Sequence, residues 1–455
     1  GSELLDVHYP YTGEVVGRVR QADPAGLEKA LASTHPVEMS RWDRHEVLDK
    51  ARTLLDERSE EFAQLIRSES GLCMRETRYE VGRAQDVLQF AAMEALRDDG
   101  QVFSCDVSPQ GKSRKIFTLR EPLHLVAAIT PFNHPLNQVA HKLAPAIAAG
   151  APVILKPSEK TPLTALRFTE LLYEAGLPLQ MLSTLVGPVD EVVTPMIEDT
   201  RVELVSFTGS VAIGKLISRT AGYKKLCLEL GGNSPLIVLD DADLDMAVTL
   251  AAEGCFRNSG QRCTAVKRLL IHEVVLEEFT TAFVEKIAEY PCGDPADEAT
   301  RVGTVIDEAA ASLLEERVGQ AVSAGAKVLA GGNREGALLE PTIIAEVPRD
   351  AGMVVEESFG PLAPILPVKN LDDAIEVANG TAFGLSCGVV TRDMDQALSC
   401  VKRIRTGTVN INAIPGYRIE SSPFGGVKDS GLGIKEGVIE AMKYMTNVKT
   451  FSLPW

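Results

Sequence analysis

Apolar and polar residues alternate with several different periods along the chain. Residues 5–20 alternate as two short strands around a turn at 11–14, and residues 23–97 carry apolar side chains three and four positions apart, as amphipathic helices do. Residues 101–120 are rich in polar and β-branched side chains, which favours an extended segment without a core of its own. We predict that this segment pairs either with a partner chain or with the C-terminal run 449–453.

From residue 123 onward, short apolar runs alternate with helical patterns. The runs expected as strands in the first block are 123–129, 151–155, 181–186, 204–207 and 225–229. In a second block they are 236–239, 268–272, 326–330, 341–344, 364–368, 387–391 and 408–411. Apolar strands that alternate with helices predict a parallel sheet covered on both faces. The fold class expected is therefore α/β, with two sheet-containing domains.

Composition and charge narrow the possible functions. The chain has 455 residues, of which 45% are hydrophobic and 24% charged, as expected for a globular protein of two or three domains. No run of about 18 apolar residues predicts a membrane-spanning helix, and the first residues show no signal-peptide pattern, so a cytoplasmic location is expected. The net charge of −17 argues against a nucleic acid or an anionic membrane as partner.

One of the eight cysteines stands out from the others. The cysteines and the seven histidines lack the spacing of a disulfide framework or a metal site, so no metal is expected. Cys263 lies between a glycine-led turn and small polar residues, next to Arg262. A neighbouring cation favours the thiolate, which is the nucleophilic form of cysteine. On this local pattern, Cys263 is either a reactive nucleophile or a buried structural thiol.

Polar residues follow the expected strands of the first block at their carboxyl ends, where parallel sheets gather functional groups. These residues are Asn133, Lys156, Glu159, Ser210 and Glu229. Lys156 and Glu159 either form a surface ion pair or bind two ribose hydroxyls. A carboxylate at this position would repel a 2′-phosphate and so favour NAD over NADP. Glu229 is either a general base or a structural carboxylate. Because Cys263 falls in the second block, we predict an active site between the two domains.

Residues 209–215 resemble the GxxxxGK loop that cradles nucleotide phosphates. The next residue, Leu216, offers no hydroxyl to magnesium, so this pattern disfavours a nucleoside triphosphatase. A helix that starts after glycine still suits a diphosphate.

Seven short motifs stand in the order and spacing of the aldehyde dehydrogenase superfamily, which the chain resembles over its whole length. They occupy residues 131–135, 156–159, 207–210 with Gly214, 229–232, 260–263, 357–361 and 423–426. The resemblance implies the aldehyde dehydrogenase-like fold and divides the chain into three parts. These are an NAD-binding domain (1–102 and 123–231), a catalytic domain (232–430), and a small β oligomerisation arm (103–122 and 431–455) that joins homodimers or homotetramers.

The resemblance also implies a reaction. Cys263 attacks an aldehyde, the Asn133 amide and the Cys263 backbone N–H hold the oxyanion, NAD accepts a hydride, and Glu229 activates the water that releases the acid. The residues that the resemblance assigns to NAD are Thr130, Phe132, Lys156, Ser158, Glu159, Gly209, Ser210, Gly214, Glu357 and Phe359. Phe132 stands where the superfamily often has tryptophan.

Substrate pockets of the superfamily are lined at positions that here hold Arg83, His134, Arg262, Thr264, Tyr417 and Arg418. Three arginines in one pocket would be costly to desolvate without an anion, and arginine matches the geometry of phosphate oxygens. Residues 71–83, 415–420, 425–433 and 444–455 most resemble the phosphonoacetaldehyde dehydrogenases. That likeness implies oxidation of phosphonoacetaldehyde to phosphonoacetate in 2-aminoethylphosphonate breakdown.

Several alternatives remain open on the sequence. Another small aldehyde, such as glyceraldehyde 3-phosphate, lactaldehyde or succinate semialdehyde, would also suit the family pattern. A relative that transfers the acyl group to coenzyme A is disfavoured by Glu229, which favours hydrolysis. A non-catalytic relative is disfavoured because both Cys263 and Glu229 are present.

Overall fold

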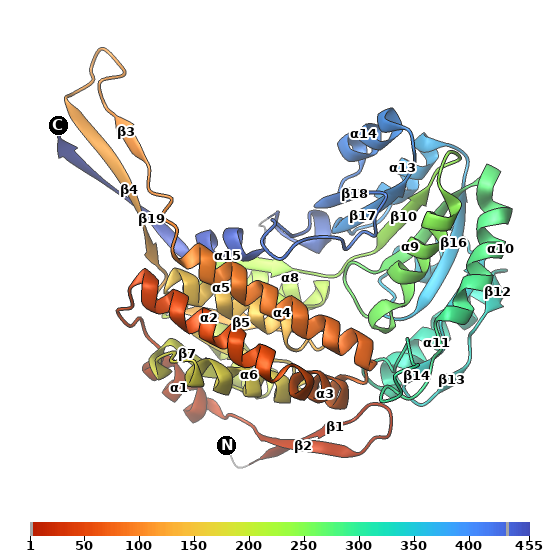
Figure 1. The fold of residues 1–455 in the computed structure, drawn as a ribbon, viewed down its shortest axis with the longest axis horizontal. Helices are drawn as coiled ribbons and strands as arrows, with labels where there is room; N and C mark the ends of the chain where they lie inside the picture. The colour runs from red at the N-terminus through yellow and green to blue at the C-terminus, as the bar shows by residue number, and fades with distance from the viewer. Residues whose placement is uncertain (1–2, 434–435) are drawn as a thin grey trace.

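Two sheets of mostly parallel strands form the two lobes of the computed structural model, which describes residues 3–433 and 436–455 (Figure 1). A narrow β arm projects from the first lobe, its tip is the loop between β3 and β4, and the chain ends beside the arm short of that loop (Figure 1). No helix within these residues is long and apolar enough to cross a bilayer. The predicted α/β class is confirmed.

The first lobe contains a five-stranded parallel sheet in the order β7-β6-β5-β8-β9. Its strands are β5 (Val126–Ile129), β6 (Val153–Lys156), β7 (Leu182–Thr184), β8 (Leu204–Thr208) and β9 (Lys225–Glu229). Its helices are α1 (Pro24–Ser33), α2 (Arg41–Glu57), α3 (Ser59–Ser70), α4 (Met74–Ala95), α5 (Asn137–Ala149), α6 (Pro162–Glu174), α7 (Thr194–Glu198), α8 (Val211–Thr220) and α15 (Val438–Tyr444). The predicted N-terminal hairpin is also present, as β1 (Leu4–His8) and β2 (Val15–Arg20).

Both faces of this sheet are buried, because successive side chains of a strand point in opposite directions. In β5, Val126 and Ala128 belong to the core formed with α2 to α6. Ala127 and Ile129 belong to the core formed with α1, α7 and α8. A sheet without a solvated face explains why its strands are continuous apolar runs in the sequence.

The second lobe contains a seven-stranded sheet in the order β12-β15-β16-β11-β10-β17-β18, in which only β12 runs antiparallel to its neighbour. Its strands are β10 (Ser234–Val238), β11 (Val266–His272), β12 (Lys327–Ala330), β15 (Thr342–Ala345), β16 (Leu362–Val368), β17 (Ser386–Val390) and β18 (Thr408–Ile411). Its helices are α9 (Leu244–Phe256), α10 (Leu276–Lys286), α11 (Glu308–Ser323), α12 (Gly352–Val355), α13 (Leu371–Asn379) and α14 (Met394–Arg403). A small hairpin, β13 (Arg334–Glu335) with β14 (Leu338–Leu339), was not predicted.

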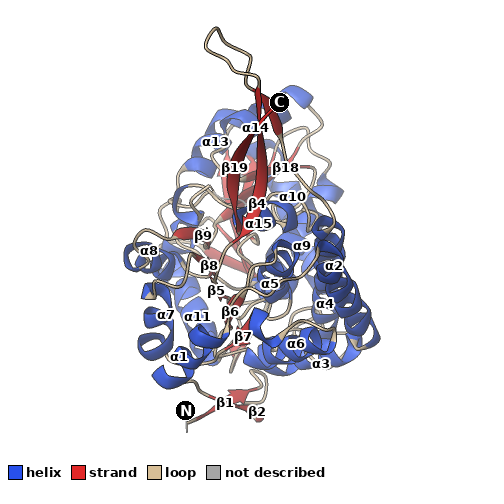
Figure 2. Cartoon of the chain, turned by 90° about the vertical axis from the view of Figure 1, so that its left-hand side faces the viewer, coloured by secondary structure: helices blue, strands red, loops and turns tan. Residues whose placement is uncertain are grey.

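The arm is a three-stranded antiparallel sheet in the order β19-β4-β3, and Figure 2 shows β19 and β4 side by side in it. Its strands are β3 (Val102–Ser104), β4 (Arg114–Pro122) and β19 (Thr446–Pro454). Strand β19 pairs with β4 over its whole length, from Thr446 opposite Pro122 to Pro454 opposite Arg114. Of the two pairings considered for the extended segment, the one with the C-terminal run is therefore present within the chain.

Candidate active site

Cys263 follows a turn with an unusual backbone. Asn258, Ser259 and Gly260 have φ values of 56°, 52° and 68°. Non-glycine residues rarely adopt this left-handed conformation, and such strain persists only where the surroundings enforce it. The Ser259 hydroxyl donates to the Gly303 carbonyl at 3.1 Å and helps to hold the turn. The turn thus presents Cys263 in a fixed orientation between the lobes.

Asn133 is tied to this turn by two hydrogen bonds. Its side-chain Nδ2 donates to the Gln261 carbonyl at 2.9 Å, and its own carbonyl accepts from Asn258 Nδ2 at 3.1 Å. An amide nitrogen carries two protons, so a second donor remains available after the bond to Gln261. Asn133 and Cys263 line the same cavity, where that donor can meet an oxygen on a reacting carbon.

Two glycines after β9 allow three segments to meet. A Cβ at Gly231 would collide with the Glu357 carboxylate, and a Cβ at Gly232 would collide with the Cys263 carbonyl oxygen. The Gly232 N–H donates to Glu357 Oε1 at 2.9 Å. Only glycine permits such close approach of backbone to neighbouring groups. Glu229, which ends β9 just before these glycines, is buried and lines the cavity that contains Cys263.

Two adjoining cavities lie along the carboxyl ends of the first-lobe strands. One, of about 260 Å³, is lined by the predicted residues Phe132, Asn133, Gly209, Ser210, Glu229, Cys263, Glu357 and Phe359. The other, of about 320 Å³, is lined by the predicted residues Thr130, Phe132, Lys156, Ser158, Glu159, Gly209 and Ser210. Lys156 and Glu159 form an ion pair at this second cavity.

The two cavities share the start of α8. Ser210 caps this helix, its hydroxyl accepting from the Ile213 N–H at 3.4 Å, and the N–H groups of a first helical turn suit a diphosphate. Together, the two cavities therefore have a lining that suits a dinucleotide, with its diphosphate at the start of α8. Gly214 lines neither cavity: a Cβ there would collide with the Leu230 side chain, so this glycine serves the packing of α8.

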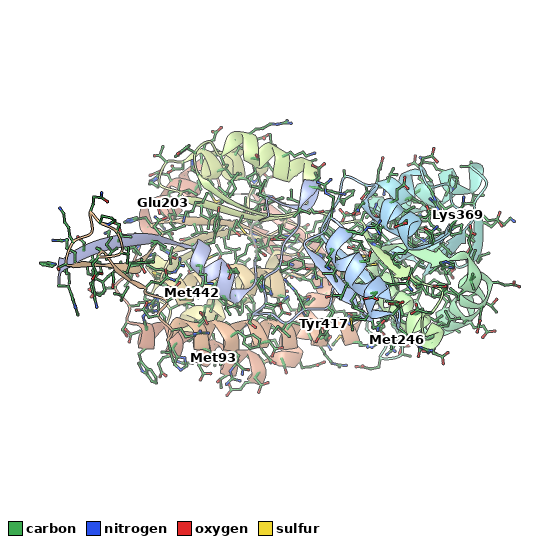
Figure 3. All side chains as sticks on the ribbon, turned by 90° about the horizontal axis from the view of Figure 1, so that it is seen from above. Met93, Glu203, Met246, Lys369, Tyr417 and Met442 are labelled. Carbon is green, nitrogen blue, oxygen red and sulfur yellow. The ribbon has the colours of Figure 1, made fainter. Side chains whose placement is uncertain are left out.

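A third cavity, of about 240 Å³, adjoins Cys263 as well. All six residues predicted for the substrate line it: Arg83, His134, Arg262, Thr264, Tyr417 and Arg418. Tyr417 is 63% exposed and lies at the junction of the two lobes, as Figure 3 shows from above. Since Cys263 also lines the 260 Å³ cavity, its side chain stands where the two cavities meet.

The arginines of the third cavity are held by a carboxylate that the sequence did not reveal. Arg83 Nε donates to Glu420 Oε1 at 2.6 Å, and Arg418 Nη2 lies 3.6 Å from Glu420 Oε2. His141 contacts the same carboxylate, and the Arg418 guanidinium lies 4.0 Å from the Phe424 ring centroid. Although burial opposes ionisation, His141, Arg83 and Arg418 hold the pKa of Glu420 below its usual value. Glu420 therefore fixes two of the three arginines.

Arg262 is held in a different way. Its Nη2 donates to the carbonyls of Glu253 and Gly254 at 2.9 Å each, at the end of α9, where a cation is favourable. Burial lowers its pKa to about 10. Burial lowers the pKa of His134 well below its usual value, and the three arginines add to this effect, so His134 is neutral at pH 7.

The thiol itself departs from the prediction based on Arg262. Burial raises the pKa of Cys263 to about 11, and the Glu357 and Glu229 carboxylates add to the rise. Arg418 and Arg262 lower this pKa, in the predicted direction, but burial outweighs them. At neutral pH Cys263 is therefore mostly protonated in the free protein.

The raised pKa predicts how the free protein reacts with iodoacetamide. Far below its pKa, the thiolate fraction grows about tenfold for each pH unit, so the alkylation rate of Cys263 should rise about tenfold per unit from pH 7 to pH 9. Mass spectrometry of the Cys263 peptide distinguishes it from the other seven cysteines. A rate that is already constant at pH 8 would contradict the burial argument.

Further lining residues were not among the site residues predicted from the sequence. Among them are Glu76, Tyr79, Glu80, Gln138 and Arg257. Arg257 Nε donates to Glu76 Oε1 at 3.0 Å, and Glu80 Oε1 accepts from the Leu136 and Asn137 N–H groups at the start of α5. Burial raises the pKa of Glu80 to about 7. The spacing of Glu76, Glu80 and Arg83 on α4 is helical, and this signal could have revealed the two carboxylates beside the arginine.

Comparison with known proteins extends these observations. A family model described as "Aldehyde dehydrogenase family" matches residues 1–451. A 3-sulfolactaldehyde dehydrogenase of Priestia aryabhattai is 40% identical over 455 residues, covering 99% of this chain and 95% of that protein. A sulfoacetaldehyde dehydrogenase of Neptuniibacter caesariensis is 38% identical, covering 97% of each chain. The solved structure of glyceraldehyde-3-phosphate dehydrogenase GapN from Methanocaldococcus jannaschii with NADP has a TM-score of 0.95 and 35% identity, covering 99% of each chain.

Proposed function

The chain belongs to the aldehyde dehydrogenase family, and from this premise we propose that it oxidises phosphonoacetaldehyde to phosphonoacetate with NAD as hydride acceptor. The observation that carries the substrate proposal is the meeting of Arg83, Arg262 and Arg418 in one cavity with Cys263. Glu76 pairs with Arg257, and Glu420 contacts both Arg83 and Arg418. Arg262 is held by two backbone carbonyls, so the arginines at the cavity outnumber the carboxylates paired with them. Such an excess of positive charge suits a small dianion.

The proposed chemistry begins at Cys263. The thiol first loses its proton to solvent, and the small fraction of thiolate so formed attacks the aldehyde carbon, whose carbonyl oxygen becomes an oxyanion. The free N–H of the Asn133 amide and the backbone N–H of Cys263 stabilise that charge. The bond from Asn133 Nδ2 to the Gln261 carbonyl keeps the amide beside the nucleophile, so this stabilisation requires no rearrangement.

The second half of the reaction releases the acid. A bound NAD would supply the hydride acceptor beside Glu357 and Phe359, and loss of hydride from the carbon attached to Cys263 would leave a thioester on this residue. Glu229 then takes a proton from a water that attacks the thioester, and the carboxylate leaves as the thiol is regenerated. Glu357 and Phe359 border the nicotinamide side of the cavity, while Lys156 and Glu159 border the adenosine side.

The carboxylate of Glu159 supports NAD over NADP, because it would lie close to a 2′-phosphate. The similar GapN structure contains NADP, so cofactor preference is a direct test of this assignment. A second substrate candidate is a sulfonate aldehyde, which the names of two relatives support. A sulfonate carries one negative charge and a phosphonate carries up to two. A cavity with several cations therefore favours the phosphonate aldehyde.

The test is an assay of NADH and NADPH formation over a panel of aldehydes. It contains phosphonoacetaldehyde, sulfoacetaldehyde, 3-sulfolactaldehyde, glyceraldehyde 3-phosphate, succinate semialdehyde and lactaldehyde. We expect the highest kcat/KM with phosphonoacetaldehyde and NAD, and the free acid as product with or without coenzyme A. A higher value for either sulfonate would replace the phosphonate proposal, and an equal value for lactaldehyde would refute an anion site.

Arg418 provides a sharper test of the anion site. We predict that Arg418→Ala lowers kcat/KM for phosphonoacetaldehyde about 100-fold, chiefly through KM, because a charge-assisted bond in a buried cavity is lost. Acetaldehyde lacks the anion, so its kcat/KM should change less than about threefold. Arg418→Met, which keeps an aliphatic stem over Phe424, serves as the matched variant and should behave alike. Equal losses on both aldehydes would show that Arg418 only supports the fold.

We also propose that the arm joins two copies of the chain. It exposes the apolar side chains of Phe103, Phe451, Leu453 and Trp455, with Trp455 72% exposed. Its outer strands leave backbone groups unpaired, which favours coverage by another chain. Light scattering on the intact chain should give a dimer or a tetramer, and a chain that ends after residue 445 should be smaller.

A further inference from the structure

A buried carboxylate stands behind the cavity that contains the three arginines. The Glu420 side chain is 6% exposed and belongs to the loop between β18 and α15. It contacts arginines that line the cavity, although it is not a lining residue itself. A negative charge so close to an anion site repels the anion. Its presence there calls for a role that outweighs this repulsion.

Glu420 contacts side chains from two helices and from its own loop. Its Oε1 accepts from Arg83 Nε on α4 at 2.6 Å, and His141 Nε2 on α5 lies 2.5 Å from Oε2. Arg418 Nη2 lies 3.6 Å from the same Oε2. Two buried guanidinium groups repel each other unless a counter-charge lies between them. The carboxylate therefore holds Arg83 and Arg418 together on one side of the cavity.

These contacts also decide which N–H groups of the arginines remain available. Arg83 is bound through Nε, and no acceptor in the described part of the chain contacts its two Nη nitrogens. Nε and Nη1 of Arg418 likewise lack an acceptor among the described residues. Nε of Arg262 is a buried donor without a partner. A guanidinium is a rigid planar fork, so fixing one edge of it orients all its other donors.

The loop that carries Glu420 has a second anchor. Lys142, the residue after His141 on α5, donates to Glu436 Oε1 at 2.8 Å and is fully buried. The Val438 N–H donates to the backbone carbonyl of Glu420 at 3.1 Å. Neither bond uses the Glu420 side chain. A replacement of this side chain should therefore change the orientation of the arginines more than the course of the loop.

We propose that Glu420 is a positioning residue that sets the preference for anionic aldehydes, because it holds Arg83 and Arg418 with their free N–H groups toward the anion. The inference rests on the proposed anion site but not on which anion occupies it. Charge alone predicts that loss of the carboxylate strengthens anion binding, since a repulsion is removed. Loss of the prearranged donors predicts the opposite. The sign of the change separates the two effects.

The test is Glu420→Gln, which nearly keeps the shape of the side chain and removes its charge. Calorimetry on the intact protein measures the Kd of phosphonoacetate and of sulfoacetate, and steady-state assays compare phosphonoacetaldehyde with acetaldehyde. We expect the Kd of both anions and the KM of phosphonoacetaldehyde to rise about tenfold. Because the reacting groups are untouched, kcat for phosphonoacetaldehyde and kcat/KM for acetaldehyde should each change less than about threefold.

Two further variants separate positioning from a loss of stability. Glu436→Gln is the matched control, because Glu436 is a buried carboxylate near Glu420 that pairs with Lys142 and not with an arginine. It should lower the Tm and leave the ratio of kcat/KM for the two aldehydes within about twofold. Glu420→Asp replaces Glu420→Gln if the latter does not fold. It keeps the charge but is too short to reach Arg83 and Arg418 together, so the same loss is expected.

The outcomes are distinct for the inference and for the proposed function. Unchanged or tighter binding of both anions in the Glu420 variant would overturn the inference, as would equal losses on phosphonoacetaldehyde and acetaldehyde. A wild type that binds neither anion more tightly than acetate would refute the anion site, and the inference with it. If only sulfoacetate binds to the wild type and the variant weakens it, the inference stands and the substrate is a sulfonate aldehyde.

Discussion

Replacement of Cys263 by alanine should lower kcat/KM at least about 10⁴-fold for every aldehyde that the protein oxidises. The reason is that the thiolate forms the covalent bond from which hydride leaves, and no neighbouring group replaces it. Cys263 is the cysteine that lines both the 240 Å³ cavity with the arginines and the 260 Å³ cavity with Glu229. Alanine removes one sulfur atom without a change of fold, so NAD should still bind with a Kd close to that of the wild type.

Steady-state NADH formation measures this loss, and calorimetry measures NAD binding. Cys105→Ala is the matched control, because Cys105 is a free cysteine outside all the lining residues of these two cavities. It should retain full activity. Residual activity above about 1% in Cys263→Ala would assign the nucleophile elsewhere.

Replacement of Glu229 by glutamine should lower kcat about 10³-fold but leave the first turnover largely intact. The amide has nearly the same shape as the carboxylate and cannot take a proton from water, so the thioester should accumulate on Cys263. Glu229 is 3% exposed at the end of β9, where it reaches the cavity from the opposite lobe to the nucleophile.

Rapid mixing distinguishes this outcome from a general loss of activity. The Glu229→Gln variant should release a burst of NADH close to one equivalent per subunit, followed by a slow steady state, and mass spectrometry should detect the acyl group on Cys263. Glu57→Gln, at an exposed carboxylate that ends α2, is the control and should behave as wild type. A variant without a burst would place Glu229 before hydride transfer and not after it.

Much of the fold followed from local pattern. Most central strands of the two sheets are buried on both faces and are therefore largely apolar runs, whereas the edge strand β12 is mostly exposed. The five strands of the first lobe were predicted within a few residues of their bounds. The hairpin β13–β14 was missed because its strands have two residues each, too few to show an alternation.

The site residues that belong to short sequence motifs could be predicted. Contacts between side chains that are far apart in the sequence could not. Glu420 contacts Arg83 across 337 residues of sequence, and no spacing rule connects them. The pKa of Cys263 depends mainly on burial, which is a property of the assembled lobes, so the adjacent Arg262 lowers this pKa as predicted but does not decide its value. Gly214 belongs to the same motif as Ser210 but faces Leu230. It lies on the side of α8 that packs against the protein core, away from the cavities.

The last part of the chain completes the lobe that is made first. Val438 and Met445 belong to the same apolar core as α2 to α6, and the Leu123 N–H donates to the Met445 carbonyl at 3.0 Å. Lys142, buried in α5, has its carboxylate partner at Glu436, 2.8 Å away. During synthesis on the ribosome, all residues of the second lobe therefore emerge before the residues that complete the core of the first lobe. A nascent chain that stops short of residue 436 would leave a buried lysine without its partner and an open apolar core, which is the kind of surface that chaperones and proteases recognise.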